Sequence, residues 1–202
     1  MRYIAFMMLI VLFIPHAVFG AFSESRNSVA LSIMTLSGQQ KGFYRTVSAQ
    51  ISPNDRNYPG YAFGLSFRSF GTSRLGAEIV FSYTKKSGTV EGLSLSTIQA
   101  FLGPVYSLPI IGSGERIIPY GTVGIVVVRN AIDLDSQTDL GFYAKLGIQG
   151  VITDRFGVAG SLVYSGVTID YDSNKGLGGQ DWISESHSYG DAQLVLEFNY
   201  FP

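Results

Sequence analysis

The chain has 202 residues, a formal net charge of −1, 14% charged residues, 13% aromatic residues and 24 glycines. This length predicts a single domain, and the many aromatic residues exclude a disordered chain. Because no basic stripe is present to neutralise phosphates, the near-zero charge argues against nucleic acid as the main partner.

The first twenty residues have the pattern of an export signal. Arg2 precedes an apolar run over residues 4–14, Pro15 ends the run, and Gly20 precedes Ala21 at a small-residue cleavage site. A retained membrane anchor is the alternative, but the run is shorter than the roughly 20 residues that a spanning helix needs. We therefore predict a cleaved signal peptide over residues 1–20 and an exported domain over residues 21–202.

Alternating apolar and polar side chains predict eight strands in the rest of the chain. The strands are expected over residues 27–36, 60–70, 74–84, 93–106 and 116–129, as two runs within 141–171 joined by a turn at 153–155, and over 186–201. The fourth strand is the least regular. Pro104 inside it predicts a bulge or an early end near Gly103.

A soluble β-sandwich and a transmembrane β-barrel both explain strands with one apolar face. The connections favour the barrel, because longer polar loops follow the odd-numbered strands, over residues 37–59, 85–92, 130–139 and 170–185, and shorter turns follow the even-numbered ones. Bacterial barrels have an even number of strands, short periplasmic turns and longer extracellular loops. The absence of cysteine agrees with a fold closed by backbone pairing alone. We predict an all-β, eight-stranded, antiparallel up-and-down transmembrane β-barrel.

A Pro-Tyr strand start followed by spaced glycines, and a glycine-containing strand that leads into a Thr-Asp turn, are further features of the chain. They are Pro119-Tyr120, Gly121, Gly124, Gly147, Gly150 and Thr153-Asp154. In these features the chain resembles the small outer-membrane β-barrel families of Gram-negative bacteria, including the opacity-protein and outer-membrane protein A/X-like groups. The resemblance implies an outer-membrane location and a role as adhesin, serum-resistance factor or structural anchor. Members usually end in a Phe that the assembly machinery reads, whereas here Pro202 follows Phe201.

If the apolar side chains face lipid, the opposite parity faces the lumen. The lumen-facing set is close to balanced in charge and contains Arg68, Glu78, Lys145, Gln149, Gln193, Glu197 and Asn199. Side chains can fill the interior of an eight-stranded barrel, so we predict a structural polar cluster that closes the lumen. A narrow or gated conduit is the alternative. The aromatic residues expected on the outer face are Tyr61, Phe67, Phe81, Tyr83, Tyr120, Phe142, Tyr164, Phe198 and Tyr200.

The expected surface loops carry the candidate interaction residues. Basic side chains at the outer rim could attract lipopolysaccharide phosphates, although solvated loop charges explain them equally well; they are Lys41, Arg45, Arg56, Lys85 and Lys86. Trp182 is the single tryptophan of the chain and falls in the last predicted loop.

No motif for catalysis or metal binding is convincing. His187 lies between Ser186 and Ser188, but adjacent strand residues point to opposite faces, so a solvated histidine is favoured over a surface hydrolase. Asp170 begins a calcium-like pattern in which Lys175 replaces the required glycine. We predict no catalytic residue, no metal and no cofactor.

The sequence therefore predicts a monomeric outer-membrane surface protein with a structural or adhesin-like role. Its expected partners are outer-membrane lipid, lipopolysaccharide and a ligand on a host or neighbouring cell. A small low-conductance channel is the second hypothesis, and a surface lipid-modifying hydrolase is the third.

Overall fold

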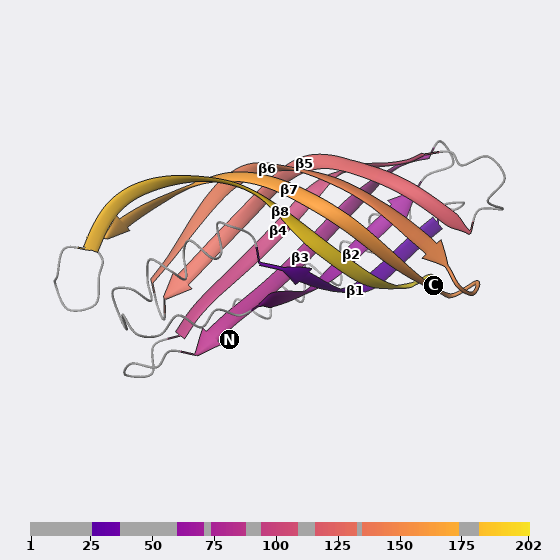
Figure 1. Ribbon diagram of the computed structural model, residues 1–202, viewed down its shortest axis with the longest axis horizontal. Helices are drawn as coiled ribbons and strands as arrows, with labels where there is room; N and C mark the ends of the chain where they lie inside the picture. The colour runs from indigo at the N-terminus through magenta and orange to yellow at the C-terminus, as the bar shows by residue number, and fades with distance from the viewer. Residues whose placement is uncertain are drawn as a thin grey trace.

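The computed structural model describes residues 26–36, 60–70, 74–87, 94–108, 116–132, 135–173 and 182–202. The described elements are the strands β1 (Arg26–Thr35), β2 (Tyr61–Phe70), β3 (Leu75–Ser87), β4 (Ser94–Ser107), β5 (Ile117–Ile132), β6 (Asp135–Val151), β7 (Phe156–Ser173) and β8 (Trp182–Tyr200). Each strand is antiparallel to its neighbours, and β8 pairs with β1 to close the barrel (Figure 1). The fold class expected from the sequence is confirmed.

Two of the predictions lie outside the described residues. They concern the signal peptide over residues 1–20 and the basic loop that contains Lys41, Arg45 and Arg56. Within the described part of the chain, no helix is long and apolar enough to cross a membrane.

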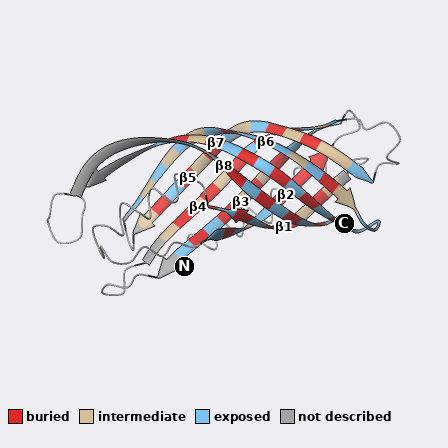
Figure 2. Ribbon diagram, viewed as in Figure 1, coloured by how far each residue is buried: buried red, intermediate tan, exposed pale blue. Residues whose placement is uncertain are grey.

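The wall of the barrel is apolar on the outside and largely polar on the inside. Buried and exposed residues alternate along the strands (Figure 2). Leu31 and Leu146 on the outer face are 66% and 67% exposed, whereas Arg68 and Glu78 on the inner face are buried. An outer surface of this kind is stable in lipid rather than water, and a polar interior within an apolar band is typical of transmembrane barrels. The predicted parity is thus confirmed for the strands that carry these residues, β1, β2, β3 and β6.

The strands differ in length around the barrel, and three predicted loops are partly wrong. Residues 85–87, predicted as loop, continue β3 and pair with β4. Residues 130–132 and 135–139, predicted as loop, continue β5 and β6, which remain paired as far as Ile132 and Asp135. Residues 170–173 and 182–185, also predicted as loop, belong to β7 and β8, which pair as far as Ser173 and Trp182 with a register shift after Tyr171. Beyond the membrane a strand needs backbone pairing but no alternating apolar face, so polar composition alone does not end it.

The bulge or early end predicted near Gly103 is also wrong. β4 pairs with β3 without interruption through Gly103 and Pro104, and its register with β5 is the same on both sides of them. Gly103 on β4 lies against β5 so closely that a Cβ atom there would overlap the backbone carbonyl of Val123. The missing side chain allows the two strands to stay in register beside a proline that cannot donate a ladder hydrogen bond.

Candidate functional site

Four charged side chains from four strands form a closed ring inside the barrel, which we call the charge ring. Arg68 comes from β2, Glu78 from β3, Lys145 from β6 and Glu197 from β8, and all four are buried. The parity of each strand turns these side chains inward. Arg68 and Glu78 also lie directly opposite each other in the β2–β3 register.

Each carboxylate in the charge ring binds both cations. Arg68 Nη2 lies 2.6 Å from Glu78 Oε1 and 2.7 Å from Glu197 Oε2. Lys145 Nζ lies 2.8 Å from Glu78 Oε1 and 2.8 Å from Glu197 Oε1. Charges therefore alternate around the ring, and its formal sum is zero. Alternation is needed here because an unpaired charge in a dry interior is very costly.

Neutral side chains complete the hydrogen bonding of the charge ring. Arg68 Nη1 donates to Gln149 Oε1 at 2.8 Å and Nη2 donates to the Tyr120 hydroxyl at 3.0 Å. The Tyr120 hydroxyl donates to Glu197 Oε2 at 3.3 Å, and Thr122 Oγ1 donates to Glu78 Oε2 at 3.1 Å. The Arg68 guanidinium carbon also lies 3.9 Å from the centre of the Tyr120 ring, a cation–π contact.

Tyr120 corrects the prediction that this aromatic faces outward, because it is buried in the lumen. Its ring lies over Gly147, its register partner on β6, where a Cβ atom would be 2.5 Å from Tyr120 Cζ. Sequence reasoning missed Tyr120 and Thr122 as members of the site. The available signal was their shared parity on β5, two residues apart.

The sequence-derived polar set is only partly brought together. Arg68, Glu78, Lys145, Gln149 and Glu197 form the hydrogen-bonded group described above. Gln193 is buried but lies apart from it, and its amide nitrogen donates to the Thr35 carbonyl at 2.8 Å. Gln193 therefore joins β8 to the end of β1 rather than contributing to the charge ring.

Apolar side chains cover the charge ring on the side of the long loops. We call this group the apolar layer; it includes Met34, Val80, Phe101, Val126, Tyr143, Val163 and Val195. The register places it directly above the charge ring, since Val80 is two residues from Glu78 and Val195 two residues from Glu197. We predicted a polar cluster as the closure of the lumen and did not predict this layer, although Val80 and Val195 share the inward parity.

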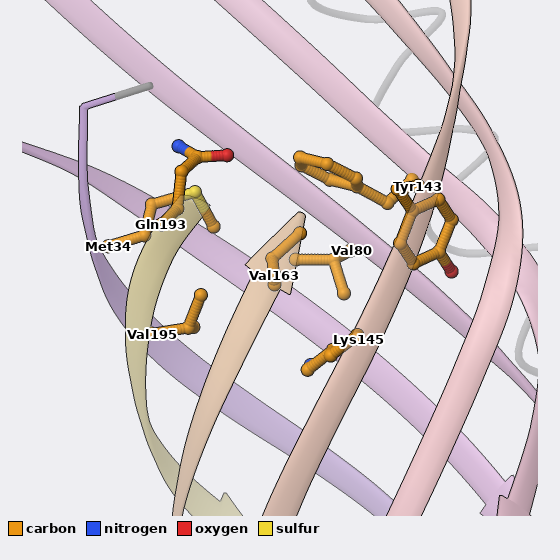
Figure 3. A pocket seen from close by; sticks show the side chains of 8 residues that line it. Met34, Val80, Tyr143, Lys145, Val163, Gln193 and Val195 are labelled. Carbon is orange, nitrogen blue, oxygen red and sulfur yellow. The ribbon is translucent and has the colours of Figure 1, made fainter. Parts of the chain in front are cut away.

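A small cavity lies between the apolar layer and Lys145 (Figure 3). Its volume is about 10 Å³, and it is lined by Met34, Val80, Phe101, Tyr143, Lys145, Val163, Gln193 and Val195. That volume is at the lower limit for a single water molecule, about 10–15 Å³. Side chains therefore fill the lumen at this level almost completely.

The candidate surface residues give no second site. Lys85 is exposed near the upper end of β3. Trp182 is the first residue of β8, opposite Ser173, rather than part of a loop. Asp170 and Asp172 lie on β7, an extended backbone unlike a calcium loop. Among the described residues, no three His, Cys, Asp or Glu side chains come together in a way that could hold a metal ion.

Comparison with known proteins identifies the architecture. No protein-family model and no curated protein matches the sequence. The solution structure of Escherichia coli outer membrane protein W aligns with a TM-score of 0.52 and 14% identity, over 90% of this chain and 100% of that one. The chain has the fold of the small outer-membrane β-barrels.

Two further barrels align less closely. The outer-membrane protein OprG from Pseudomonas aeruginosa aligns with a TM-score of 0.48 and 13% identity, over 87% of this chain and 95% of that one. The attachment invasion locus protein of Yersinia pestis, solved in complex with a heparin analogue, has the same TM-score and identity, over 87% and 96%. Identities this low relate the small barrels by fold alone.

Proposed function

We propose that this small barrel is a non-conducting outer-membrane surface protein whose role is structural and adhesive. Its lumen is closed, and its ligands bind at the end of the barrel that carries the long loops. The observation that carries the proposal is the charge ring covered by the apolar layer. We propose no catalytic activity, because His187 and its serine neighbours are consecutive residues of one strand.

Two features of the lumen support closure. The charge ring has no net charge, unlike the rings of a single sign that select ions in channels. An ion crossing the lumen would have to separate Arg68 or Lys145 from the carboxylates that bridge them at 2.6–2.8 Å. The apolar layer adds a second barrier, since an ion there would lose its hydration without gaining a polar partner.

The height of the wall supports an adhesive role. A tilted strand needs about 9–11 residues to cross the membrane, and β1 and β2 have 10 each. β7 and β8 have 18 and 19 and reach past the ends of β1 and β2 (Figure 1). This part of the sheet is therefore longer than crossing the membrane requires. Loops on a rigid scaffold commonly carry binding function. The residues proposed to contact ligand or lipopolysaccharide are Lys41, Arg45, Arg56, Lys85 and Trp182.

Single-channel recording of the refolded protein in planar bilayers tests closure. A heated-versus-unheated gel shift of the same sample shows that the barrel is folded. We expect a heat-shifted protein that gives no channel openings. Reproducible openings that change when Glu78→Gln or Lys145→Met is introduced would overturn the proposal and favour the low-conductance channel.

Binding to vesicles that contain lipopolysaccharide tests the adhesive part. Trp182→Ala should leave the gel shift unchanged and weaken binding. Lys85→Gln removes a second proposed contact, on β3, and should weaken binding as well. Binding that is unaffected by both substitutions would exclude these two residues from the contact surface.

A further inference from the structure

Three exposed arginines occupy corresponding positions at the end of the barrel opposite the long loops, which we call the short-turn rim. Arg74 directly precedes β3, Arg116 directly precedes β5 and Arg155 directly precedes β7. All three are exposed. They are therefore spaced two strands apart around one edge of the barrel.

The backbone of each arginine is held in the same way. The Arg74 carbonyl accepts from Ser107 N at 2.9 Å, at the end of β4. The Arg116 carbonyl accepts from Val151 N at 2.7 Å, at the end of β6, and the Arg155 carbonyl accepts from Phe201 N at 2.9 Å, just after β8. Each arginine is thus fixed to the end of the next strand along the chain, which keeps the three positions rigid relative to one another.

The three guanidinium groups are not used for binding within the described structure. Among the described residues none of them forms an ion pair or donates a side-chain hydrogen bond. Asp154 is the one described acidic side chain at this rim, and no ion pair joins it to Arg155. Among the described residues, this rim therefore presents three guanidinium groups without a side-chain partner and the Asp154 carboxylate; Glu115, next to Arg116 in the sequence, lies outside the described residues.

The arginines lie at the level where lipid head groups are expected. The residue after each one faces lipid: Leu75, Ile117 and Phe156 are 54%, 49% and 56% exposed. Tyr106 and Tyr200, also exposed, lie at the same end of the barrel, and tyrosine is enriched at membrane interfaces. Guanidinium groups just outside an apolar band match the position and geometry of phosphates, which they bind through two parallel hydrogen bonds.

The backbone of Arg74 provides an independent observation. Its φ is +64°, the only positive value at a non-glycine residue among those described. Glycine adopts this conformation at little cost, whereas other residues are strained in it. Strained residues tend to occur where the side chain has a use, and here that side chain is an unpaired guanidinium at the membrane surface.

We propose that Arg74, Arg116 and Arg155 form a binding site for anionic phospholipid head groups of the leaflet at the short-turn rim. Each guanidinium binds a lipid phosphate, and together they fix the depth and tilt of the barrel. The site is distinct from the lumen and the long loops, and it does not depend on whether the lumen conducts.

The proposal is tested by measuring which lipid lies next to a fluorescent residue placed at this rim. Tyr106 lies opposite Leu75, the neighbour of Arg74, so Tyr106→Trp places a fluorescent reporter beside the site. Trp182→Phe removes the single native tryptophan, which lies at the other end of the barrel. Quenching by brominated phosphatidylglycerol is then compared with quenching by brominated phosphatidylcholine in mixed vesicles, after a gel shift confirms folding.

We expect the reporter to select phosphatidylglycerol by about fivefold at low salt, the effect of roughly one basic residue near an anionic surface. Changing all three arginines to Gln should abolish the preference, and changing all three to Lys should retain part of it. Arg74→Gly is the most informative single change, because it relieves the backbone while removing the guanidinium. It should lower selectivity and leave the urea midpoint unchanged or higher.

Equal quenching by both lipids in the reporter protein that keeps all three arginines would overturn the proposal. So would a phosphatidylglycerol preference that survives the triple Gln substitution. If the triple variant does not fold, the Arg74→Gly result decides, and unchanged selectivity in that variant would again contradict the site. If the triple Gln variant keeps its lipid selectivity but no longer binds isolated cell-wall fragments, the arginines bind a carboxylate polymer and the proposal is wrong.

Discussion

At the scale of single residues, the charge ring is the most constrained group in the molecule. Four charges are buried, and each of the two carboxylates lies within 2.8 Å of both cations. Removing one partner of a buried ion pair is far more costly than removing both, because the remaining charge keeps its desolvation cost and loses its compensation. The ring therefore links β2, β3, β6 and β8. Loss of one of its charges should be tolerated better when an opposite charge is removed with it.

A double-mutant cycle tests this coupling. Glu197→Gln leaves Arg68 and Lys145 to share Glu78, and we expect it to lower the free energy of unfolding by about 3–5 kcal/mol. Adding Lys145→Met restores neutrality and should recover more than half of that loss, since Arg68 and Glu78 remain paired. Urea unfolding in lipid vesicles measures both. Strictly additive losses would show that the charges are independently solvated.

The sequence predicted the charged members of this site but not its neutral ones. Strand parity placed Arg68, Glu78, Lys145 and Glu197 inward, because charge and alternation agree at those positions. Tyr120 was assigned to the lipid face because aromatic residues are common there. It turns inward because it shares the parity of the buried Thr122 on β5, and Gly147, opposite it on β6, leaves space for its ring. Such a pairing depends on register, which one strand read alone does not reveal.

At the scale of strands, the sequence predicted the membrane-crossing parts well and their outer ends poorly. Lipid forces every second residue to be apolar, so β2 was predicted to within one residue. Toward the outer ends of β5 to β8 the alternating pattern disappears from the sequence, although the backbone pairing continues to Ile132 and Ser173. Composition alone therefore cannot distinguish a solvated strand from a loop.

The close approach of β4 and β5 gives a prediction at this scale. A methyl group at Gly103 would overlap the Val123 backbone carbonyl, which cannot rotate away. We expect Gly103→Ala to lower the free energy of unfolding by about 1–3 kcal/mol, the usual cost of overpacking. Gly160→Ala is the control, because a Cβ atom there meets nothing within 4 Å. Equal urea midpoints for the two variants would show that β4 and β5 separate at little cost.

At the scale of the whole barrel, the interior is arranged in layers, with the charge ring between two groups of apolar side chains. Tyr143 and Phe101 of the apolar layer pack edge to face, with ring centres 5.2 Å apart, above a charge ring that Phe70 and Val105 cover from the side of the short-turn rim. Water is thereby kept from the ring on both sides, which strengthens its electrostatic interactions. In the non-conducting barrel that we propose, the apolar layer is a second barrier to ions.

If the lumen is closed as we propose, the charge ring and the apolar layer are two barriers in series, and opening either one alone should not open the lumen. Phe101→Ala enlarges a cavity that now has a volume of about 10 Å³. It leaves the ion pairs of the charge ring intact, so planar-bilayer recordings should remain silent. Glu78→Gln with Arg68→Gln removes one cation and one anion below an intact apolar layer and should also remain silent. Only the three substitutions together should give small openings, because ions then meet neither apolar walls nor a complete ring. Openings in the Phe101→Ala variant alone would make the apolar layer the sole barrier and reduce the charge ring to a structural element.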